Sequence, residues 1–231
     1  MATTGAGNRL LADLDSTELE LLRPDLQLVH LERGAVLAEA GQPSAHLYFP
    51  VKCVLSLVGT TEGGATVEVA VIGRDGMASV SAALGRRRLP FRVVVQIEGA
   101  AWRILTEIVT RQMRDCRGLH ERLLHYSHYV IAQVGQSAIC NRFHNAKQRL
   151  ARWLLMTADH ADSRELPLTH EFISHMVGGP RSAVTEAAAA LRESGAIDYR
   201  RGMLTIRSLD KLRSEACECY EAVAASSDPT P

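Results

Sequence analysis

Arg181, Ser182, Thr185 and Glu186 fall near the start of one predicted helix, at positions that its apolar residues leave facing outward. An arginine can donate two parallel hydrogen bonds to O6 and N7 of guanine, and a glutamate can accept a hydrogen bond from the amino group of cytosine. The chemistry that these four residues offer is therefore the recognition of base edges, and we expect all four to contact bases.

A pair of short helices must position these side chains. The first is predicted to begin after Thr169, which is a good N-cap, and to end at Gly178-Gly179. Pro180 opens the second helix, which covers about residues 180–194. The inward stripe of the second helix consists of Val184, Ala187, Ala188 and Leu191. Two short helices joined by a glycine turn form a helix-turn-helix, which places its second helix in the major groove of DNA.

A basic hairpin follows directly. Two short strands, Ile197–Tyr199 and Leu204–Ile206, flank an Arg-Arg-Gly turn and form a wing. A helix pair alone is a weak signal, but together with the outward arginine and the basic wing it indicates a DNA-binding domain rather than a generic helical hairpin. Basic side chains and helix N-termini suit contact with phosphates. We assign such contacts to Thr169, His170, Arg200 and Arg201.

The N-terminal half has a different texture. Short apolar runs alternate with glycine turns about every 8–12 residues, a rhythm typical of an all-β sandwich or roll. The predicted strands are Leu26–Leu31, Val36–Ala38, Ala45–Phe49, Cys53–Thr60, Thr66–Ile72 and Arg92–Glu98. After Gly99 the texture becomes helical, with a short helix at Thr106–Arg111. The fold class is therefore α+β.

A long helix without proline is predicted from about Leu119 to Asn141. Steps of four and three residues define a seam that starts apolar and becomes small and polar, made of Leu119, Leu123, Tyr126, Val130, Gln133, Ser137 and Cys140. Because an exposed rod of this length needs a partner to bury it, we expect the seam to join two copies of the chain. The alternative is that the helix lies on the β domain of its own chain.

Over nearly its whole length the sequence resembles the Crp/Fnr superfamily of bacterial transcription regulators. In the C-terminal part the resemblance rests on Gln148-Arg149-Leu150-Ala151, Leu166-Pro167-Leu168-Thr169, Gly178, Arg181, Val184, Leu191, Gly195 and the wing. In the N-terminal half it rests on Arg33-Gly34, Gly41, Leu47-Tyr48-Phe49, Gly73 and Gly76. The resemblance implies a cyclic-nucleotide-binding-type β-roll (a double-stranded jelly roll) at 1–115, a dimerisation helix at 116–143 and a winged helix-turn-helix at 144–231.

Two positions depart from the cyclic-nucleotide-binding members of that superfamily. Those members have a glutamate for the ribose hydroxyl where this chain has Arg74, and their phosphate-binding arginine is shifted here by one residue, to Arg92. On a strand such a shift turns the side chain to the opposite face, so we do not expect cyclic AMP to bind in the usual manner. Arg74, Asp75 and Arg92 could line a pocket for an unknown effector, or could only form surface ion pairs.

Five scattered cysteines indicate a reducing cytoplasm, and because the first is Cys53 we do not expect the N-terminal iron-sulfur cluster of oxygen-sensing members. Cys140 and His144 are four residues apart and could chelate a metal, with Cys217 and Cys219 completing the site. We favour buried cysteines without a metal. The reason is that positions i and i+2 of one terminal helix, predicted from Ser208 to about Ala225, point about 200° apart.

The composition is that of an ordinary globular protein of 231 residues, with 26 Lys and Arg against 26 Asp and Glu. No apolar run approaches the roughly 20 residues of a membrane helix, and the N-terminus lacks an apolar signal core, so we expect a cytoplasmic protein without a membrane partner. The zero net charge does not exclude DNA, because binding depends on the local field that faces the phosphates. We find no nucleophile motif, no phosphate-binding loop and, in the β region, no cluster of His and carboxylate ligands. We therefore do not expect an enzyme.

Taken together, these features predict a homodimeric, sequence-specific transcription regulator that binds a near-palindromic operator in double-stranded DNA. The resemblance implies RNA polymerase as a further partner, and control by an unidentified signal that biases a hinge at 141–145. The alternative is a ligand- or nucleotide-sensing protein whose helix-turn-helix mediates protein contacts rather than DNA reading.

Overall fold

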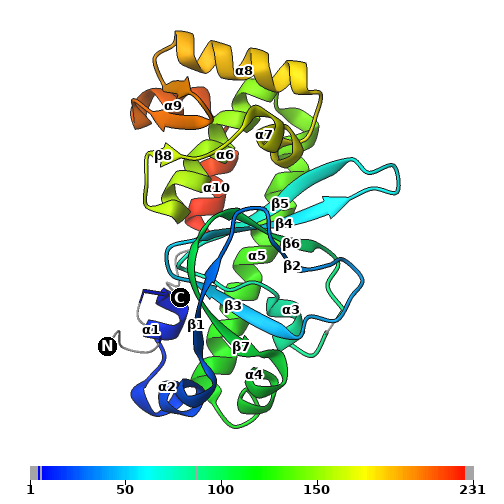
Figure 1. Cartoon of the computed structure of the whole chain (residues 1–231), viewed down its shortest axis with the longest axis vertical. Coiled ribbons are helices and arrows are strands. Elements are labelled where there is room, and N and C mark those ends of the chain that lie inside the picture. Colours follow the sequence, from blue (N-terminus) through cyan, green and yellow to red (C-terminus); the bar gives the residue numbers. More distant parts are fainter. Residues whose placement is uncertain (1–4, 6, 87, 227–231) are drawn as a thin grey trace. The chain divides into compact units, whose positions relative to one another are not determined.

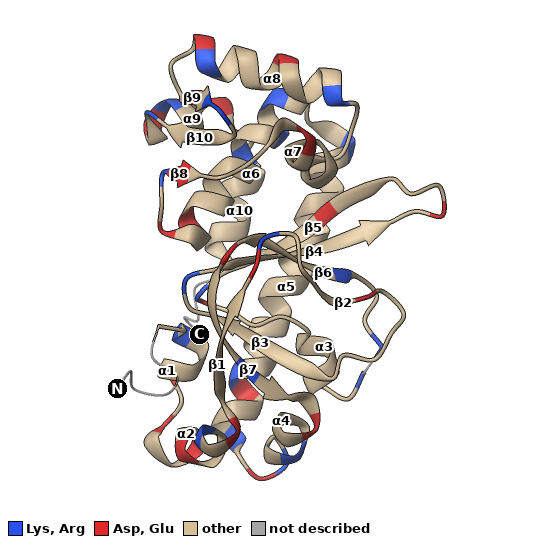
Figure 2. Ribbon diagram, viewed as in Figure 1, with Lys and Arg blue, Asp and Glu red and all other residues tan. Residues whose placement is uncertain are grey.

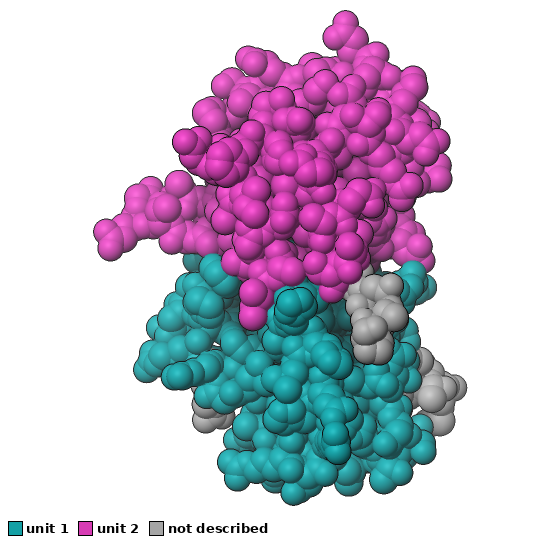
Figure 3. Space-filling model, turned by 180° about the vertical axis from the view of Figure 1, so that it is seen from behind, with its two compact units in different colours: residues 1–57, 71–130 teal, residues 58–70, 131–231 magenta. Residues whose placement is uncertain are grey.

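The computed structural model describes residues 5, 7–86 and 88–226. Two units make up the chain, the first from residues 1–57 and 71–130 and the second from residues 58–70 and 131–231 (Figure 3). The order of elements is a β domain, a long helix and a helix-turn-helix, which confirms the predicted α+β class (Figure 1). The boundaries at 115 and 143 that the resemblance implies for separate domains stay a prediction.

Two sheets form the β domain. The first has the strand order β1-β7-β3, and the second has the order β2-β6-β4-β5. All six predicted strands are present, each within one residue of its predicted ends. The strands of the two sheets are β1 (Gln27–Leu31), β2 (Val36–Ala38), β3 (His46–Pro50), β4 (Val54–Thr60), β5 (Thr66–Ile72), β6 (Arg92–Ile97) and β7 (Gly99–Leu105).

Strand β7 was not predicted, and it is the central strand of the first sheet. It pairs in antiparallel fashion with β1 on one side and with β3 on the other. Its first half contains Ala100 and Ala101. Because alanine is depleted in strands, the sequence did not predict a strand here. Gly99 begins the strand at φ +153°, and a Cβ there would lie 2.3 Å from the carbonyl oxygen of Lys52. Only glycine fits that close approach of two backbone segments.

Helix α5 (Arg117–Phe143) is the long helix that the sequence predicted. A carboxylate oxygen of Glu18 accepts hydrogen bonds from the backbone N–H groups of Gly118 (2.8 Å) and Leu119 (3.2 Å). This negative charge satisfies unpaired donors of the first turn and complements the helix dipole. The shorter helical segments of the first unit are α1 (Arg9–Ala12), α2 (Ser16–Leu22), η1 (Arg23–Asp25), α3 (Val80–Ala83) and α4 (Thr106–Gln112).

The predicted seam of α5 lies on the side of the helix that its own chain covers. Leu119, Leu123, Tyr126, Gln133, Ser137 and Cys140 are all buried within the single chain, and only Val130 is partly exposed. A Cβ on Gly76 would lie 2.3 Å from the hydroxyl oxygen of Tyr126, so the tyrosine packs directly on that backbone. Residues already buried in this way have little surface left to offer a second chain. A stripe of period 3.5 looks the same whether it faces its own domain or a partner, so a role of this seam between two chains stays a prediction.

The second unit is built around helix α6 (Ala146–Ala161), which packs on α7, α8, α9 and α10. Asn145 and Gln148 form a capping box that fixes the start of α6. The other elements are β8 (Glu165–Leu166), α7 (His170–Val177), α8 (Arg181–Glu193), β9 (Ile197–Arg200), β10 (Met203–Ile206), α9 (Leu209–Glu215) and α10 (Cys219–Ala225). None of the helices among the described residues is long and apolar enough to cross a membrane.

The predicted terminal helix from Ser208 to about Ala225 is wrong, because the structure divides it. Helix α9 ends at Glu215, Ala216 takes an extended backbone conformation (φ −79°, ψ 161°), and α10 begins only at Cys219. Cys217 therefore lies outside both helices. The interruption contains neither glycine nor proline, so no local breaker in the sequence marks it.

Candidate nucleic-acid interface

The two helices of the helix-turn-helix begin and end at residues that the sequence singled out. The hydroxyl oxygen of Thr169 accepts a hydrogen bond from the backbone N–H of Phe172 (3.1 Å) and caps α7. Helix α7 ends at Val177, and its C-cap residue Gly178 has φ +71°. Pro180 is the N-cap of α8 rather than its first helical residue. The predicted inward stripe of α8 is confirmed, because its four members are buried: Val184, Ala187, Ala188 and Leu191.

An arginine from α6 anchors the turn between the helices. The Nη2 atom of Arg149 donates to the carbonyl oxygen of Gly178 (3.0 Å). Gly179 follows at φ +126°, and a Cβ there would lie 3.3 Å from the same Nη2 atom. The turn thus needs glycine for its backbone conformation, and the arginine fixes where α8 starts. Arg149 was noticed only as part of a family motif, since nothing in the sequence links it to a turn 29 residues away.

The four proposed base-reading residues, Arg181, Ser182, Thr185 and Glu186, are all exposed on α8. Their spacing places them on one face of its first turns. The hydroxyl of Thr185 donates to the carbonyl oxygen of Arg181 (2.9 Å), so its oxygen lone pairs and methyl group remain free for other contacts. The structure thus brings together the four residues that the sequence selected, and their contacts with bases stay a prediction.

The wing is a two-residue hairpin held close to the start of α7. Its tip contains Arg201 at φ +50° and Gly202 at φ +81°, the positive values that tight hairpin turns require. The hydroxyl of Tyr199 in β9 donates to the carbonyl oxygen of Leu168 (3.0 Å). This bond ties the wing to the segment that leads into α7, so Arg201 and Thr169 belong to neighbouring parts of one surface.

A cluster of charges surrounds Asp198 in β9. Its carboxylate lies 3.0 Å from Arg207, 3.3 Å from Arg200 and 3.7 Å from Arg192. The hydrogen bond from Arg207, followed by that from the backbone N–H of Tyr199, lowers the pKa of Asp198 below its ordinary value. One carboxylate is thus shared by three guanidinium groups, which leaves a local excess of positive charge at the wing although the whole chain is neutral (Figure 2).

His170, which the sequence assigned to phosphate contact, packs against the wing. Its ring packs on the ring of Tyr199 with the centroids 4.3 Å apart, and its Nε2 atom is buried with no hydrogen-bond partner among the described residues. Burial, followed by the positive charge of Arg181, lowers the pKa of His170. The buried Nε2 atom faces away from solvent, and the contact of His170 with a phosphate stays a prediction. The sequence could not show this, because Tyr199 is distant along the chain.

The β4–β5 hairpin, residues 58–70, contacts the helix-turn-helix within the second unit. The hydroxyl of Thr66 donates to the carbonyl oxygen of His175 (3.2 Å), and a Cβ on Gly178 would lie 3.0 Å from the side chain of Val67. A buried carboxylate oxygen of Glu68 accepts a hydrogen bond from the indole N–H of Trp153 in α6 (2.8 Å). These contacts join segments about 85 to 110 residues apart, so sequence reasoning missed them.

Among the three residues proposed for an effector pocket, Arg92 forms a surface ion pair. Its Nε atom lies 2.8 Å from a carboxylate oxygen of Glu39, and both side chains are about half exposed. This contact agrees with the surface-pair alternative for Arg92. Arg74 and Asp75 follow strand β5, and a pocket that includes them stays a prediction.

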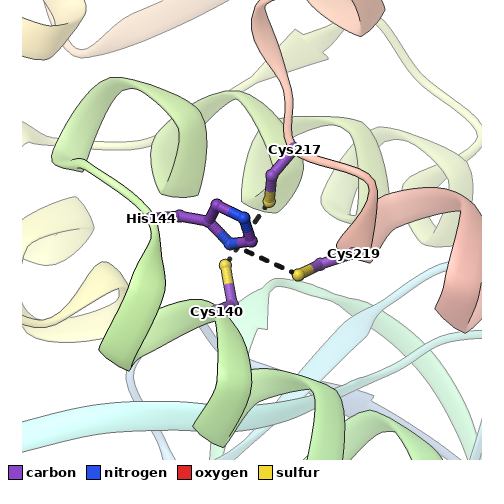
Figure 4. Close-up of side chains that lie close together, drawn as sticks. All are labelled: Cys140, His144, Cys217 and Cys219. Atoms are coloured by element: carbon purple, nitrogen blue, oxygen red, sulfur yellow. Dashed lines mark hydrogen bonds between the residues drawn. The ribbon is translucent and has the colours of Figure 1, made fainter.

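Cys140, His144, Cys217 and Cys219 converge, contrary to the favoured interpretation of separate buried cysteines (Figure 4). One ligand atom from each lies within 4.8 Å of all the others. The argument against a shared site assumed that Cys217 and Cys219 lie on one helix. Because Cys217 precedes α10, the two thiols can turn toward the same point.

Comparisons with known proteins agree with this geometry. Residues 148–215 match the family model of the Crp-like helix-turn-helix domain. Among curated protein sequences none matches the chain significantly. A protein assigned to the Crp/Fnr family of transcriptional regulators from Eubacterium rectale has a similar structure, with a TM-score of 0.70 and 18% identity over 92% of this chain and 98% of that one.

Two further solved structures show the same likeness. The c-di-GMP responsive global regulator CLP of Xanthomonas campestris has a TM-score of 0.69 and 11% identity over 84% of this chain and all of that one (100%). FixK2 of Bradyrhizobium japonicum has a TM-score of 0.67 and 11% identity over 83% and 98%. At these identities the likeness establishes the fold.

The helix pair, its glycine turn and the hairpin after it define the C-terminal part as a winged helix-turn-helix domain. More closely, residues 148–215 form a Crp-like helix-turn-helix domain, and the whole chain has the fold of the Crp/Fnr transcription regulators. The resemblance inferred from the sequence is thereby confirmed.

Proposed function

We propose that the protein is a sequence-specific DNA-binding transcription regulator in which α8 enters the major groove. The observation that carries this proposal is the exposed first part of α8, with Arg181, Ser182, Thr185 and Glu186 on one face beside a basic wing. The wing residues Arg200 and Arg201, with Thr169 at the start of α7, would contact phosphates and set the register of α8 on the duplex.

The protein would act as a homodimer that pairs through α5. The exposed face of this helix carries large apolar side chains, with Leu124 47%, Ile131 69%, Ile139 47% and Phe143 72% exposed. Steps of seven residues relate Leu124, Ile131 and Ala138, as in a two-helix seam. Gly135 lies on the same face with nothing near its Cβ position, which leaves room for a second backbone. This stripe replaces the buried seam as our proposed interface.

Substituting Ile131 with aspartate is expected to convert the dimer to a monomer at micromolar concentration, because the change places a charge at the centre of an apolar seam. Sedimentation velocity or size-exclusion chromatography with light scattering measures the outcome. His125→Asp is the matched control, since it adds the same charge at an exposed position beside the stripe. An Ile131→Asp protein that remains as dimeric as wild type would contradict the interface.

A signal would reach α8 through the β4–β5 hairpin and the hinge at 141–145. The hinge is short, because α5 ends at Phe143 and α6 begins at Ala146. The hairpin contacts α7 through Thr66 and α6 through Glu68. A change in the β domain that moves this hairpin would therefore favour one arrangement of the helix-turn-helix over another. An effector in the β domain and a contact with RNA polymerase remain part of this proposal.

Selection of bound duplexes from a random DNA pool tests the proposed function. We expect enrichment of a near-palindrome whose half-site centres lie about one helical turn, roughly 34 Å, apart. A pool that yields no enriched palindrome would instead favour a helix-turn-helix that binds another protein. The Thr169→Ala and Arg201→Ala proteins are useful companions, because loss of a phosphate contact weakens binding without changing the selected sequence.

A further inference from the structure

Cys140 and His144 at the end of α5 meet Cys217 and Cys219 at the start of α10 (Figure 4). The three cysteines are at most 5% exposed, and the His144 side chain is 12% exposed. We propose that these four residues bind one zinc ion as a structural site that fastens the start of α10 to the end of α5. This inference does not depend on whether the protein binds DNA.

The distances fit a single tetrahedral ion. The sulfur atoms of Cys140 and Cys217 are 3.6 Å apart, and the sulfur of Cys219 lies 3.4 Å from Nδ1 of His144. With Zn–S bonds of about 2.3 Å and Zn–N bonds of about 2.0 Å, tetrahedral angles require S···S and S···N separations of about 3.8 and 3.5 Å. Small side-chain movements would therefore complete the site. The ligands of an iron-sulfur cluster are spread over several iron atoms and lie farther apart than these.

The groups around the four ligands are those that a zinc site needs. The Nε2 atom of His144 lies 3.2 Å from a carboxylate oxygen of Glu218, so Nδ1 is left to face the thiols. A metal-bound histidine usually donates its other ring N–H to such a carboxylate, which fixes the tautomer and the ring orientation. The side-chain amide of Gln136 donates to the sulfur of Cys219 (3.1 Å), a contact that would stabilise a thiolate.

A buried arginine supplies the charge balance. Three thiolates, one neutral imidazole and Zn²⁺ carry a net charge of −1. Arg152 in α6 is only 8% exposed, and its Nε atom has no hydrogen-bond partner among the described residues. The Nη2 atom of Arg152 donates a hydrogen bond to the hydroxyl oxygen of Ser137, which lies one turn before Cys140 on α5. A buried cation is costly unless a negative group compensates it, and the proposed site would be that group.

Four protein ligands leave no open coordination position, which is the pattern of a structural rather than a catalytic zinc site. Soft thiolates combined with imidazole select zinc over magnesium or calcium. On binding, each of the three thiols loses its proton to solvent as its Zn–S bond forms, and the histidine nitrogen donates its lone pair. No oxidant or reductant takes part.

Metal content and cobalt spectroscopy test the proposal on the full chain. Protein purified under reducing conditions with added zinc is expected to hold one zinc per chain after dialysis. Cobalt substitution should give the visible bands of tetrahedral coordination and a thiolate charge-transfer band. Both signals should disappear in Cys140→Ser and Cys219→Ser, whereas Cys116→Ser, which changes another buried cysteine outside the cluster, should keep them.

Glu218→Gln keeps the test decisive if the cysteine variants fail to fold, because that side chain is 77% exposed. Loss of the carboxylate partner should weaken zinc affinity by about 10- to 100-fold in competition with a chromophoric chelator. Glu221→Gln, at an exposed position in α10, should leave the affinity unchanged. Protein that binds no zinc, that keeps its zinc without Cys140 and Cys219, or that carries a Cys140–Cys217 disulfide with no metal would overturn the proposal.

Discussion

Replacing Arg181 with alanine is expected to weaken operator binding by about 5- to 150-fold and to relax selectivity at one base pair of each half-site. The range corresponds to the roughly 1–3 kcal/mol that a bidentate arginine–guanine contact contributes to discrimination. Arg181 is the first residue of α8 and is exposed, so its removal should leave the fold intact. Titration of labelled duplexes that carry the selected operator, or the operator with single base changes, measures both effects at fixed salt.

Arg201→Ala is the matched control for this prediction, because it removes the same charge from the tip of the wing. A lost phosphate contact lowers affinity for all duplexes alike and reduces the slope of log K against log salt by about 0.9. Arg181→Ala should instead reduce the difference in binding affinity between the operator and its single-base variants. If its affinity fell uniformly across all duplexes, Arg181 would be a phosphate contact and the proposed base reading would be wrong.

The helix-turn-helix could be predicted in detail because its signals are local. The boundaries of α7, the turn and α8 follow from four signals within one stretch of about 25 residues. These are an N-cap threonine, a glycine pair, a proline and a stripe of small apolar residues. The same local rules located the strands with glycine turns. They failed at β7, because Ala100 and Ala101 have low strand propensity and the strand forms through its pairing with β1 and β3.

Features that depend on contacts between distant residues could not be predicted. The packing of the His170 ring depends on Tyr199, and the turn after α7 depends on Arg149. Helix periodicity identified one stripe of α5 but could not decide whether its own chain or a second chain covers that stripe. The Cys140–His144 pair was visible as a spacing, yet its completion by Cys217 depended on a helix break that no local residue signals.

The buried contact between Trp153 and Glu68 gives the second large expected effect. In Trp153→Phe the carboxylate oxygen of Glu68 that accepts the indole N–H loses this donor while it stays buried. Removing the donor to a buried acceptor costs about 1–3 kcal/mol, so the free energy of unfolding should fall by about that amount. Urea denaturation followed by far-ultraviolet circular dichroism measures the change without relying on the altered tryptophan.

A double-mutant cycle separates the lost hydrogen bond from the loss of ring volume. Glu68→Leu alone leaves the indole N–H without its acceptor, whereas Trp153→Phe combined with Glu68→Leu removes both polar partners together. Replacing both members of a buried pair by apolar groups can be nearly neutral. The double variant should therefore lose less stability than the sum of the losses in the two single variants. The expected coupling is about 1–2 kcal/mol. Strictly additive losses would mean that Glu68 does not hold the β4–β5 hairpin to α6 through this bond, and that the proposed route from the β domain to α8 lacks one of its contacts.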